Sequence, residues 1–264
     1  MNLYDSEIEI IKSFQLLPIN DICLIPQTCE ETETVLLSIL DADKWSYWID
    51  SSGKSDPPPD FYSDKYELMM DVMKVDDHEF LGRKGKVVNP TRTLESDIIN
   101  VLKKKYNFPN NPNIQIQVLA STDLPADEDH NYRFYKASFK RTVESHIKKI
   151  KRYRENHPGY KTIFFIFDES SAYFNMDSEG QKVREGEIFE GVPHYWFADK
   201  AFLNVFKDSA IDFLIWYTPY KHCTAFEVES GIALDLPRAV IYDVKNIDIP
   251  LMEYDELLME SSEI

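Results

Sequence analysis

The chain has 264 residues, of which 43% are hydrophobic and 13% aromatic, so it can bury a sizeable core. Its formal net charge is −17, and its longest apolar runs, 163–167 and 213–217, are far too short to cross a bilayer. The acidic first residues lack the layout of a signal peptide, and the three cysteines make no disulfide framework. We therefore expect a folded, reduced, cytoplasmic protein with no membrane segment.

The apolar pattern predicts helices and strands that alternate along the chain. Helices are expected at 7–14, from Thr28 as N-cap through Leu40, at 93–105, at 132–157 and at 195–208. Strands are expected at 45–50, from Asp60 onward, and at 66–75, 114–120, 162–170, 211–218 and 239–245. Continuous apolar strands are typical of a sheet covered on both faces, so we predict an α/β fold with a mixed central sheet flanked by helices.

Sequence motifs for common cofactor and hydrolase chemistry are missing. The eight glycines form neither GxGxxG nor GxxxxGK[ST], so no nucleotide cofactor is expected. The absence of GxSxG excludes the usual nucleophile elbow of serine hydrolases. The six histidines form no HExxH or HxH pair, so these motifs do not indicate a zinc hydrolase.

The charge is unevenly spread along the chain. Residues 83–105 carry seven basic and two acidic side chains, and residues 133–161 carry ten basic and two acidic ones. One interpretation is a local positive face that binds the phosphate backbone of a nucleic acid. The other is a pair of solvated helix faces that balance the acidic remainder. The residues expected to contact phosphates are Lys103, Lys104, Lys148, Lys149 and Arg152.

The segment 57–78 places carboxylates in an apolar setting. Asp60 follows three prolines, and Asp71 comes eleven residues later in a predicted strand rich in methionine, leucine and valine. Lys74 follows in the same strand. Two carboxylates and a lysine at one point of a sheet suit a metal-dependent phosphodiesterase, since carboxylates hold Mg²⁺ and lysine neutralises phosphate.

The predicted elements from 28 to 120 follow the order helix, three strands, helix, strand. With an acid on the first helix, Pro59-Asp60 at the second strand and Asp71 with Lys74 on the third, this segment resembles the PD-(D/E)XK nuclease superfamily. The resemblance implies a restriction-endonuclease-like core and cleavage or binding of nucleic acid.

The resemblance also implies a role for each residue of the motif. Asp60, Asp71 and Lys74 would be catalytic, and Mg²⁺ would lie on Glu33, Asp60 and Asp71. The family pattern places the acid and the lysine two residues apart, whereas Asp71 and Lys74 are three apart. A regular strand would point them to opposite faces, and a β-bulge between them would bring them to one face.

The rest of the chain is expected to extend this core within a single α/β domain. Residues 121–247 would form an α/β extension, and 248–264 an acidic tail with six acidic residues and no lysine or arginine. We expect the tail to be a short amphipathic helix that docks on the body or on a protein partner.

Three further segments are candidates for ligands. Asp168 and Glu169 end a buried strand, where open α/β sheets bind ligands, although Asp168 could equally cap the next turn. The run 76–79 could hold a metal, but adjacent residues rarely converge on one ion, so we interpret it as a solvated turn. Asp243 and Lys245 have the two-residue spacing of the family motif without its preceding elements.

Two functions of different classes are consistent with the sequence. The first is a Mg²⁺-dependent nuclease-like enzyme, or an inactive relative that still binds nucleic acid. The second is a non-enzymatic acidic module that binds a protein partner through its tail. Mg²⁺ should stabilise the first and leave the second unchanged.

Overall fold

The computed structural model describes residues 6–53, 59–82, 86–106, 130–177, 191–221, 224–227 and 232–262, without the side chains of 81, 92, 103, 106, 224–227 and 232–235. The predicted strand at 114–120 lies outside these residues. In the part of the chain so described, no helix is long and apolar enough to cross a membrane.

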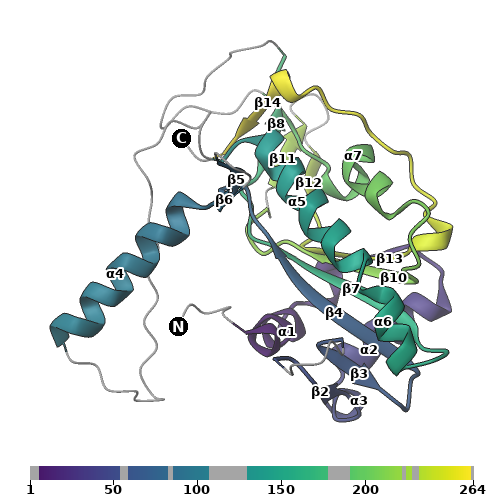
Figure 1. Ribbon diagram of the computed structural model, residues 1–264. Coiled ribbons are helices and arrows are strands. Elements are labelled where there is room, and N and C mark those ends of the chain that lie inside the picture. Colours follow the sequence, from purple (N-terminus) through teal and green to yellow (C-terminus); the bar gives the residue numbers. More distant parts are fainter. Residues whose placement is uncertain are drawn as a thin grey trace.

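A seven-stranded mixed sheet forms the centre of the molecule (Figure 1), which confirms the predicted α/β fold. In spatial order its strands are β1 (Ile22–Ile25), β13 (Ala239–Asp243), β10 (Phe213–Tyr217), β7 (Lys161–Asp168), β4 (Leu68–Val75), β3 (Phe61–Ser63) and β2 (Ile49–Asp50). The three central strands β4, β7 and β10 are parallel, and β2, β3 and β4 form an antiparallel meander. The carboxyl ends of the parallel strands β4, β7 and β10 therefore lie at the same edge of the sheet.

Helices cover both faces of this sheet. One face carries α1 (Glu7–Gln15) and α2 (Glu30–Leu40), and the other carries α5 (Tyr132–Ile147), α6 (Ile150–Asn156) and α7 (Lys200–Leu203). Strand β4 shows the alternation that results, because Met70 and Val72 pack in the α1–α2 cluster while Met73 and Val75 pack in the α5–α6 cluster.

Further elements lie outside the central sheet. After β4 come β5 (Phe80–Leu81), β6 (Val87–Val88) and α4 (Pro90–Tyr106), which projects away from the sheet in Figure 1. The others are β8 (Tyr173–Asn175), β9 (Val192–Pro193), β11 (Thr224–Glu227), β12 (Ile232–Asp235), β14 (Met259–Ser261), α3 (Ala42–Trp45) and the 3-10 turns η1 (Ile19–Asp21), η3 (Trp196–Ala198), η4 (Asn204–Phe206), η5 (Val244–Asn246) and η6 (Glu256–Leu258).

The strand predicted at 45–50 is mostly wrong, because local capping and packing outweigh the β propensity of its aromatic residues. Asp41 accepts hydrogen bonds from the backbone N–H groups of Asp43 and Lys44, which starts α3. Trp45 then stacks on Trp48, with ring centroids 5.6 Å apart. Only β2 at the end of the segment is extended.

Three predicted helices also differ from the structure. The N-cap of α2 is Cys29 rather than Thr28. The helix expected at 132–157 divides into α5 and α6. The helix expected at 195–208 is broken into η3, α7 and η4, because Asp199 caps a new helix by accepting a hydrogen bond from the N–H of Ala201.

The acidic tail docks on the body as a strand rather than as a helix. Strand β14 pairs with β8, and Met259 is buried in the core. Lys136 of α5 forms an ion pair with Glu256, and Lys200 of α7 forms one with Glu253. The tail therefore uses part of its apolar surface and part of its charge within the protein.

Candidate functional site

Asp60 and Asp71 lie opposite each other where strands β3 and β4 separate. Phe61 pairs with Met70, so the next position along each strand places Asp60 across from Asp71. Asp60 ends the β3–β4 ladder, because its Oδ2 accepts a hydrogen bond of 2.7 Å from the backbone N–H of Val72. Beyond this point no strand of the described chain pairs with that edge of β4.

Helices α5 and α6 hold the buried Asp71 carboxylate. Its Oδ2 lies 2.5 Å from Nδ1 of His146 and accepts a hydrogen bond of 3.1 Å from the hydroxyl of Tyr153. Burial and the negative charge of Asp71 raise the pKa of Tyr153 well above its usual value, so this tyrosine remains a donor.

The two carboxylates oppose each other electrostatically. Burial raises the pKa of Asp60 to about 8, and the charge and hydrogen bonding of Asp71 and the charge of Glu7 act in the same direction. The N–H of Val72 acts in the opposite direction. At neutral pH the pair therefore keeps a proton, as carboxylates that share a site do.

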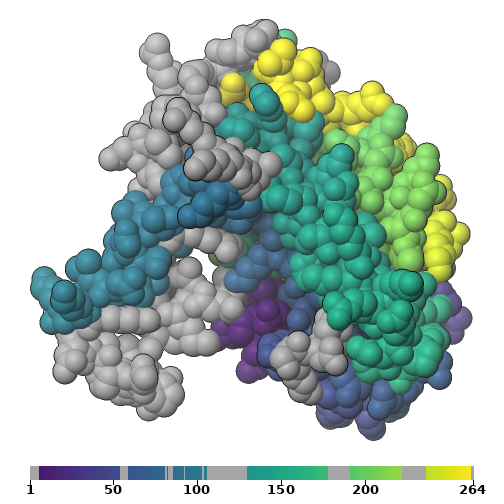
Figure 2. All heavy atoms as spheres, viewed as in Figure 1, coloured from purple at the N-terminus to yellow at the C-terminus, as the bar shows by residue number. Residues whose placement is uncertain are grey.

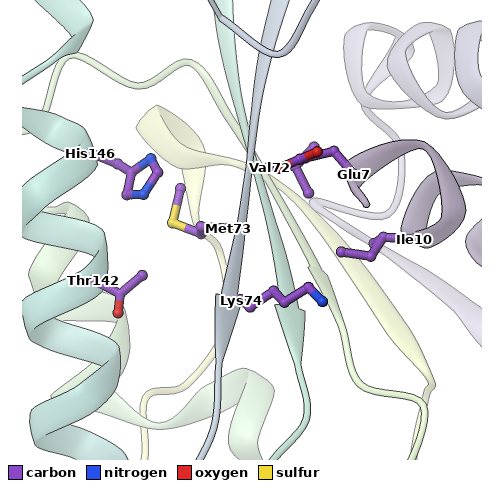
Figure 3. A pocket seen from close by; sticks show the side chains of 7 residues that line it. All are labelled: Glu7, Ile10, Val72, Met73, Lys74, Thr142 and His146. Carbon is purple, nitrogen blue, oxygen red and sulfur yellow. The ribbon is translucent and has the colours of Figure 1, made fainter. Parts of the chain in front are cut away.

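A pocket of about 380 Å³ lies beside this pair at the edge of β4 (Figure 3). It is lined by Glu7, Ile10, Val72, Met73, Lys74, Thr142 and His146. The lining comes from both faces of the sheet, because α1 contributes on one side and α5 on the other. In Figure 2, β4 (blue) is visible at the surface between α1 (purple) and α5 (teal). The pocket thus reaches the direct neighbours of the carboxylate pair, although neither aspartate is in the lining.

Lys74 points to the opposite face of β4 from Asp71. The pairing of β4 with β7 runs without interruption from Leu68 to Val75, so no bulge separates the two residues. Lys74 nevertheless lines the pocket, because the pocket wraps around the edge of the strand (Figure 3).

Glu33 is not brought to the pair. It is exposed on α2, whose buried residues pack on the face of the sheet opposite to that of Asp71. The acid that a helix contributes here is Glu7, in the first turn of α1. Sequence reasoning missed Glu7, His146 and Tyr153, although all three lie on predicted helices, because their partners are fixed by how the helices dock.

The predicted phosphate-binding residues fall in two places. Lys148, Lys149 and Arg152 are exposed at the junction of α5 and α6, directly after His146. Lys104 is exposed on α4, a helix that lies far from α6 in Figure 1, and the side chain of Lys103 lies outside the described residues. Only the first group is close in the chain to residues that contact Asp71, namely His146 and Tyr153.

Asp168 is a buried structural residue whose oxygens are occupied by protein donors. Its Oδ2 accepts from the amine of Lys221 at 2.8 Å, the indole of Trp216 at 2.9 Å and the hydroxyl of Tyr135. Its Oδ1 accepts from the backbone and the hydroxyl of Ser170. Burial lowers the pKa of Lys221, although the charge of Asp168 opposes this shift.

Two other candidates have structural contacts. Glu169 is half-buried, and its N–H donates to the carbonyl of Val75, which ties the ends of β7 and β4 together. Asp243 caps η5, while the amine of Lys245 pairs with Asp212 instead.

Comparisons of the chain with protein-family models, with curated proteins and with solved structures found no match. The site must therefore be interpreted from its own geometry.

Proposed function

We propose that this protein is a Mg²⁺-dependent phosphodiesterase of the nuclease type, acting at the Asp60–Asp71 pair. The observation that carries the proposal is the position of these two carboxylates, side by side where two strands separate and next to an open pocket. Adjacent carboxylates are the ligands that hard divalent cations take.

The residues present fit such an ion. Burial first, and then the negative charges of Asp71 and Glu7, raise the pKa of Asp60, and a divalent cation beside the pair would favour its ionised form. Bound there, Mg²⁺ would supply Lewis-acid activation of water and phosphate. His146 and Tyr153 fix the orientation of Asp71, and the second ring nitrogen of His146 remains to hold a proton beside the pocket. Lys74 adds positive charge to the pocket wall, where a phosphate would sit.

The order of elements also supports a restriction-endonuclease-like core. Helices α1 and α2 precede the meander β2–β3–β4, and α4, α5 and α6 then lead to β7, which is parallel to β4. The order resembles the expected helix, three strands, helix and strand only in part, because β1 lies between α1 and α2, α3 follows α2, and the hairpin β5–β6 lies between β4 and α4.

A second candidate function is nucleic-acid binding without cleavage. It is favoured by Lys74, which faces away from Asp71, since the expected motif needs the acid and the lysine on one face of the strand. The exposed Lys148, Lys149 and Arg152, which follow the pocket residue His146 in the chain, would serve either function.

A cleavage assay separates these functions. Single-stranded and double-stranded DNA and RNA are incubated with the protein in Mg²⁺, in Mn²⁺ and in chelator. The variants are Asp60→Asn and Asp71→Asn, with Asp64→Asn as the control because Asp64 is an exposed aspartate just after β3.

Metal-dependent cleavage that both Asp60→Asn and Asp71→Asn abolish and Asp64→Asn keeps would support the enzyme. If the wild type binds these nucleic acids but does not cleave them, the second function, nucleic-acid binding without cleavage, would be supported instead. If the folded wild type neither binds nor cleaves any of these nucleic acids, both are overturned. Thermal melting of each variant checks that loss of activity is not loss of fold.

A further inference from the structure

A second cluster of metal-binding side chains lies at the carboxyl end of β4. Asp77 and His78 follow this strand, and His130 precedes the N-cap of α5. The interpretation of 76–79 as a solvated turn is wrong, because Asp76 is buried and Asp77 is 0% exposed. Asp77 faces into the protein, where the segment after β7 meets it.

The two oxygens of Asp77 have different surroundings. Oδ2 accepts three hydrogen bonds, from the backbone of Ser171 at 3.0 Å, its hydroxyl at 2.6 Å and the hydroxyl of Tyr173 at 2.7 Å. Oδ1 is buried and accepts no hydrogen bond of good geometry from the described residues. A buried carboxylate oxygen ordinarily has a donor or a cation beside it. One oxygen therefore anchors the side chain, and the other is available for a ligand.

Two imidazole rings face that oxygen. Nδ1 of His130 lies 3.4 Å from Oδ1 of Asp77, and Nε2 of His78 lies 3.8 Å from it. Both distances are longer than a normal N–H···O hydrogen bond. The rings contact each other edge to face with centroids 4.2 Å apart, so both nitrogens approach the same point.

The other side of the His78 ring is held by the protein. Its Nδ1 lies 3.2 Å from the hydroxyl oxygen of Thr91, a buried residue in the first turn of α4. A proton on Nδ1 that is donated to Thr91 leaves the lone pair of Nε2 directed to the Asp77 side. Histidines that bind metals characteristically carry an outer hydrogen bond of this kind.

We propose that Asp77, His78 and His130 bind a divalent transition-metal ion of the zinc class. Two imidazole nitrogens and one carboxylate oxygen are a donor set for zinc and its neighbours, whereas Mg²⁺ prefers oxygen ligands alone. Three protein ligands leave a fourth position for water.

The spacing of the ligand atoms fits this ion after a small closure. The three atoms lie within 4.8 Å of one another. Bonds of about 2.0–2.1 Å in a tetrahedral site place ligand atoms about 3.3 Å apart, which His130 and Asp77 already satisfy. The side chains of His78 and His130 are each 17% exposed, whereas Oδ1 of Asp77 and Nδ1 of His130 are buried.

The test is a zinc titration of full-length protein that has been stripped with chelator. Calorimetry measures the stoichiometry and the affinity, and Co²⁺ in place of Zn²⁺ reports the coordination geometry through its visible absorption. The variants His78→Gln and His130→Gln remove one ligand each at partly exposed positions, so both should fold. His157→Gln is the matched control, because His157 is half-buried and contacts the rings of Tyr62 and Tyr160 instead.

We expect the wild type to bind one Zn²⁺ per chain at this cluster and each ligand variant to lose at least tenfold in affinity, with His157→Gln unchanged. The variant Thr91→Val should lose about tenfold, since it removes only the outer hydrogen bond. Asp60→Asn should bind Zn²⁺ here as the wild type does, which keeps this site independent of the proposed nuclease function.

Two results would overturn the proposal. One is the absence of saturable Zn²⁺ or Co²⁺ binding in the stripped, folded wild type. The other is binding that persists with unchanged affinity in both His78→Gln and His130→Gln, or that Asp60→Asn abolishes, since the ion would then lie elsewhere.

Discussion

Two aspartates six residues apart, Asp71 on β4 and Asp77 just after it, have opposite electrostatic environments. Asp71 lies against a second carboxylate, and the pKa of that partner, Asp60, is raised to about 8 by burial, by Asp71 and by Glu7. At Asp77 burial alone would raise the pKa, but His130, His78 and Ser171 outweigh it and hold the pKa well below its usual range. The same side chain thus becomes half of a proton-sharing pair in one place and a fixed anion in the other.

The two environments favour different cations. The Asp60–Asp71 pair offers only oxygen ligands and an excess of negative charge, which favours Mg²⁺. The Asp77 cluster offers one anion and two imidazoles, which favours zinc. Neither preference follows from the aspartates themselves, since both depend on what the neighbouring helices and loops bring to the strand.

Removal of Asp77 should have the largest effect. Asp77→Ala leaves the backbone and hydroxyl of Ser171 and the hydroxyl of Tyr173 without their acceptor. We expect the free energy of unfolding to fall by about 3–5 kcal/mol, since buried donors would lose a charged partner. Urea denaturation of metal-free protein measures this, with Asp64→Ala as the control. A loss no greater than that of the control would mean that Asp77 is not held as described.

The pH dependence of stability should have opposite signs in the two regions. The folded-state pKa of Asp60 lies above the unfolded value, so its contribution is fully present below about pH 4 and is lost as pH rises through about 8. The slope is at most about 1.4 kcal/mol per pH unit. For Asp77, whose folded-state pKa is lowered, the contribution is present above about pH 4 and is lost as pH falls.

The variant Asp60→Asn tests the predicted pH dependence of stability at Asp60. Asparagine keeps an oxygen for the N–H of Val72 but carries no titrating group. The metal-free variant should therefore be more stable than the wild type at pH 9 and should lose the slope between pH 5 and pH 8. If the free energy of unfolding depends on pH in the variant as it does in the wild type, the pKa of Asp60 lies near its ordinary value.

Stabilisation by Mg²⁺ and stabilisation by Zn²⁺ should depend on different residues, one set in each region. Mg²⁺ at ten times its dissociation constant should stabilise the wild type by about 1.4 kcal/mol, because the ion binds only the folded state. Thermal melting should show that Asp60→Asn loses the Mg²⁺ effect and keeps the Zn²⁺ effect, and that His78→Gln does the reverse. If one substitution removes both effects, the two regions do not bind metals separately.

The smallest effect on stability should come from the exposed basic residues. Lys148→Ala, Lys149→Ala and Arg152→Ala should each change stability by less than about 0.5 kcal/mol. In nucleic-acid binding each should lower the slope of log affinity against log salt by about 0.7–0.9, as expected for one lost phosphate contact. Lys104→Ala on α4 is the control and should leave the slope unchanged.

Much of the sheet could be predicted from the sequence because its central strands are continuous apolar runs. The runs 163–167 and 213–217 became β7 and β10, and the segment 66–75 became β4. Strand β1 could not be found in this way, since its four residues depend on pairing with β13, more than 200 residues away in the chain. Tertiary packing likewise decided the segment around Trp45 and Trp48, where local propensity favoured a strand.

The residues of the candidate sites also divide into those that the sequence could predict and those that it could not. Asp60 and Asp71 could be identified as a pair because charged residues at the start of, or within, apolar strands are unusual. His146 and Glu7 could not, because helix docking rather than chain spacing brings them to the pocket. The cluster at Asp77 was missed for a similar reason, since His130 joins it from more than 50 residues further along the chain.

Helix α5 begins just after His130 and ends just after His146, so it fixes the distance between the two regions. Sixteen residues of helix rise about 24 Å. Strand β4 gives a second measure, because its four residue steps from Asp71 to Val75 rise about 13 Å. Dinuclear metal centres need their ions about 3.5–4 Å apart. The two proposed sites are therefore too far apart to share a dinuclear centre, and a chain that filled both would carry two separate ions of different kinds.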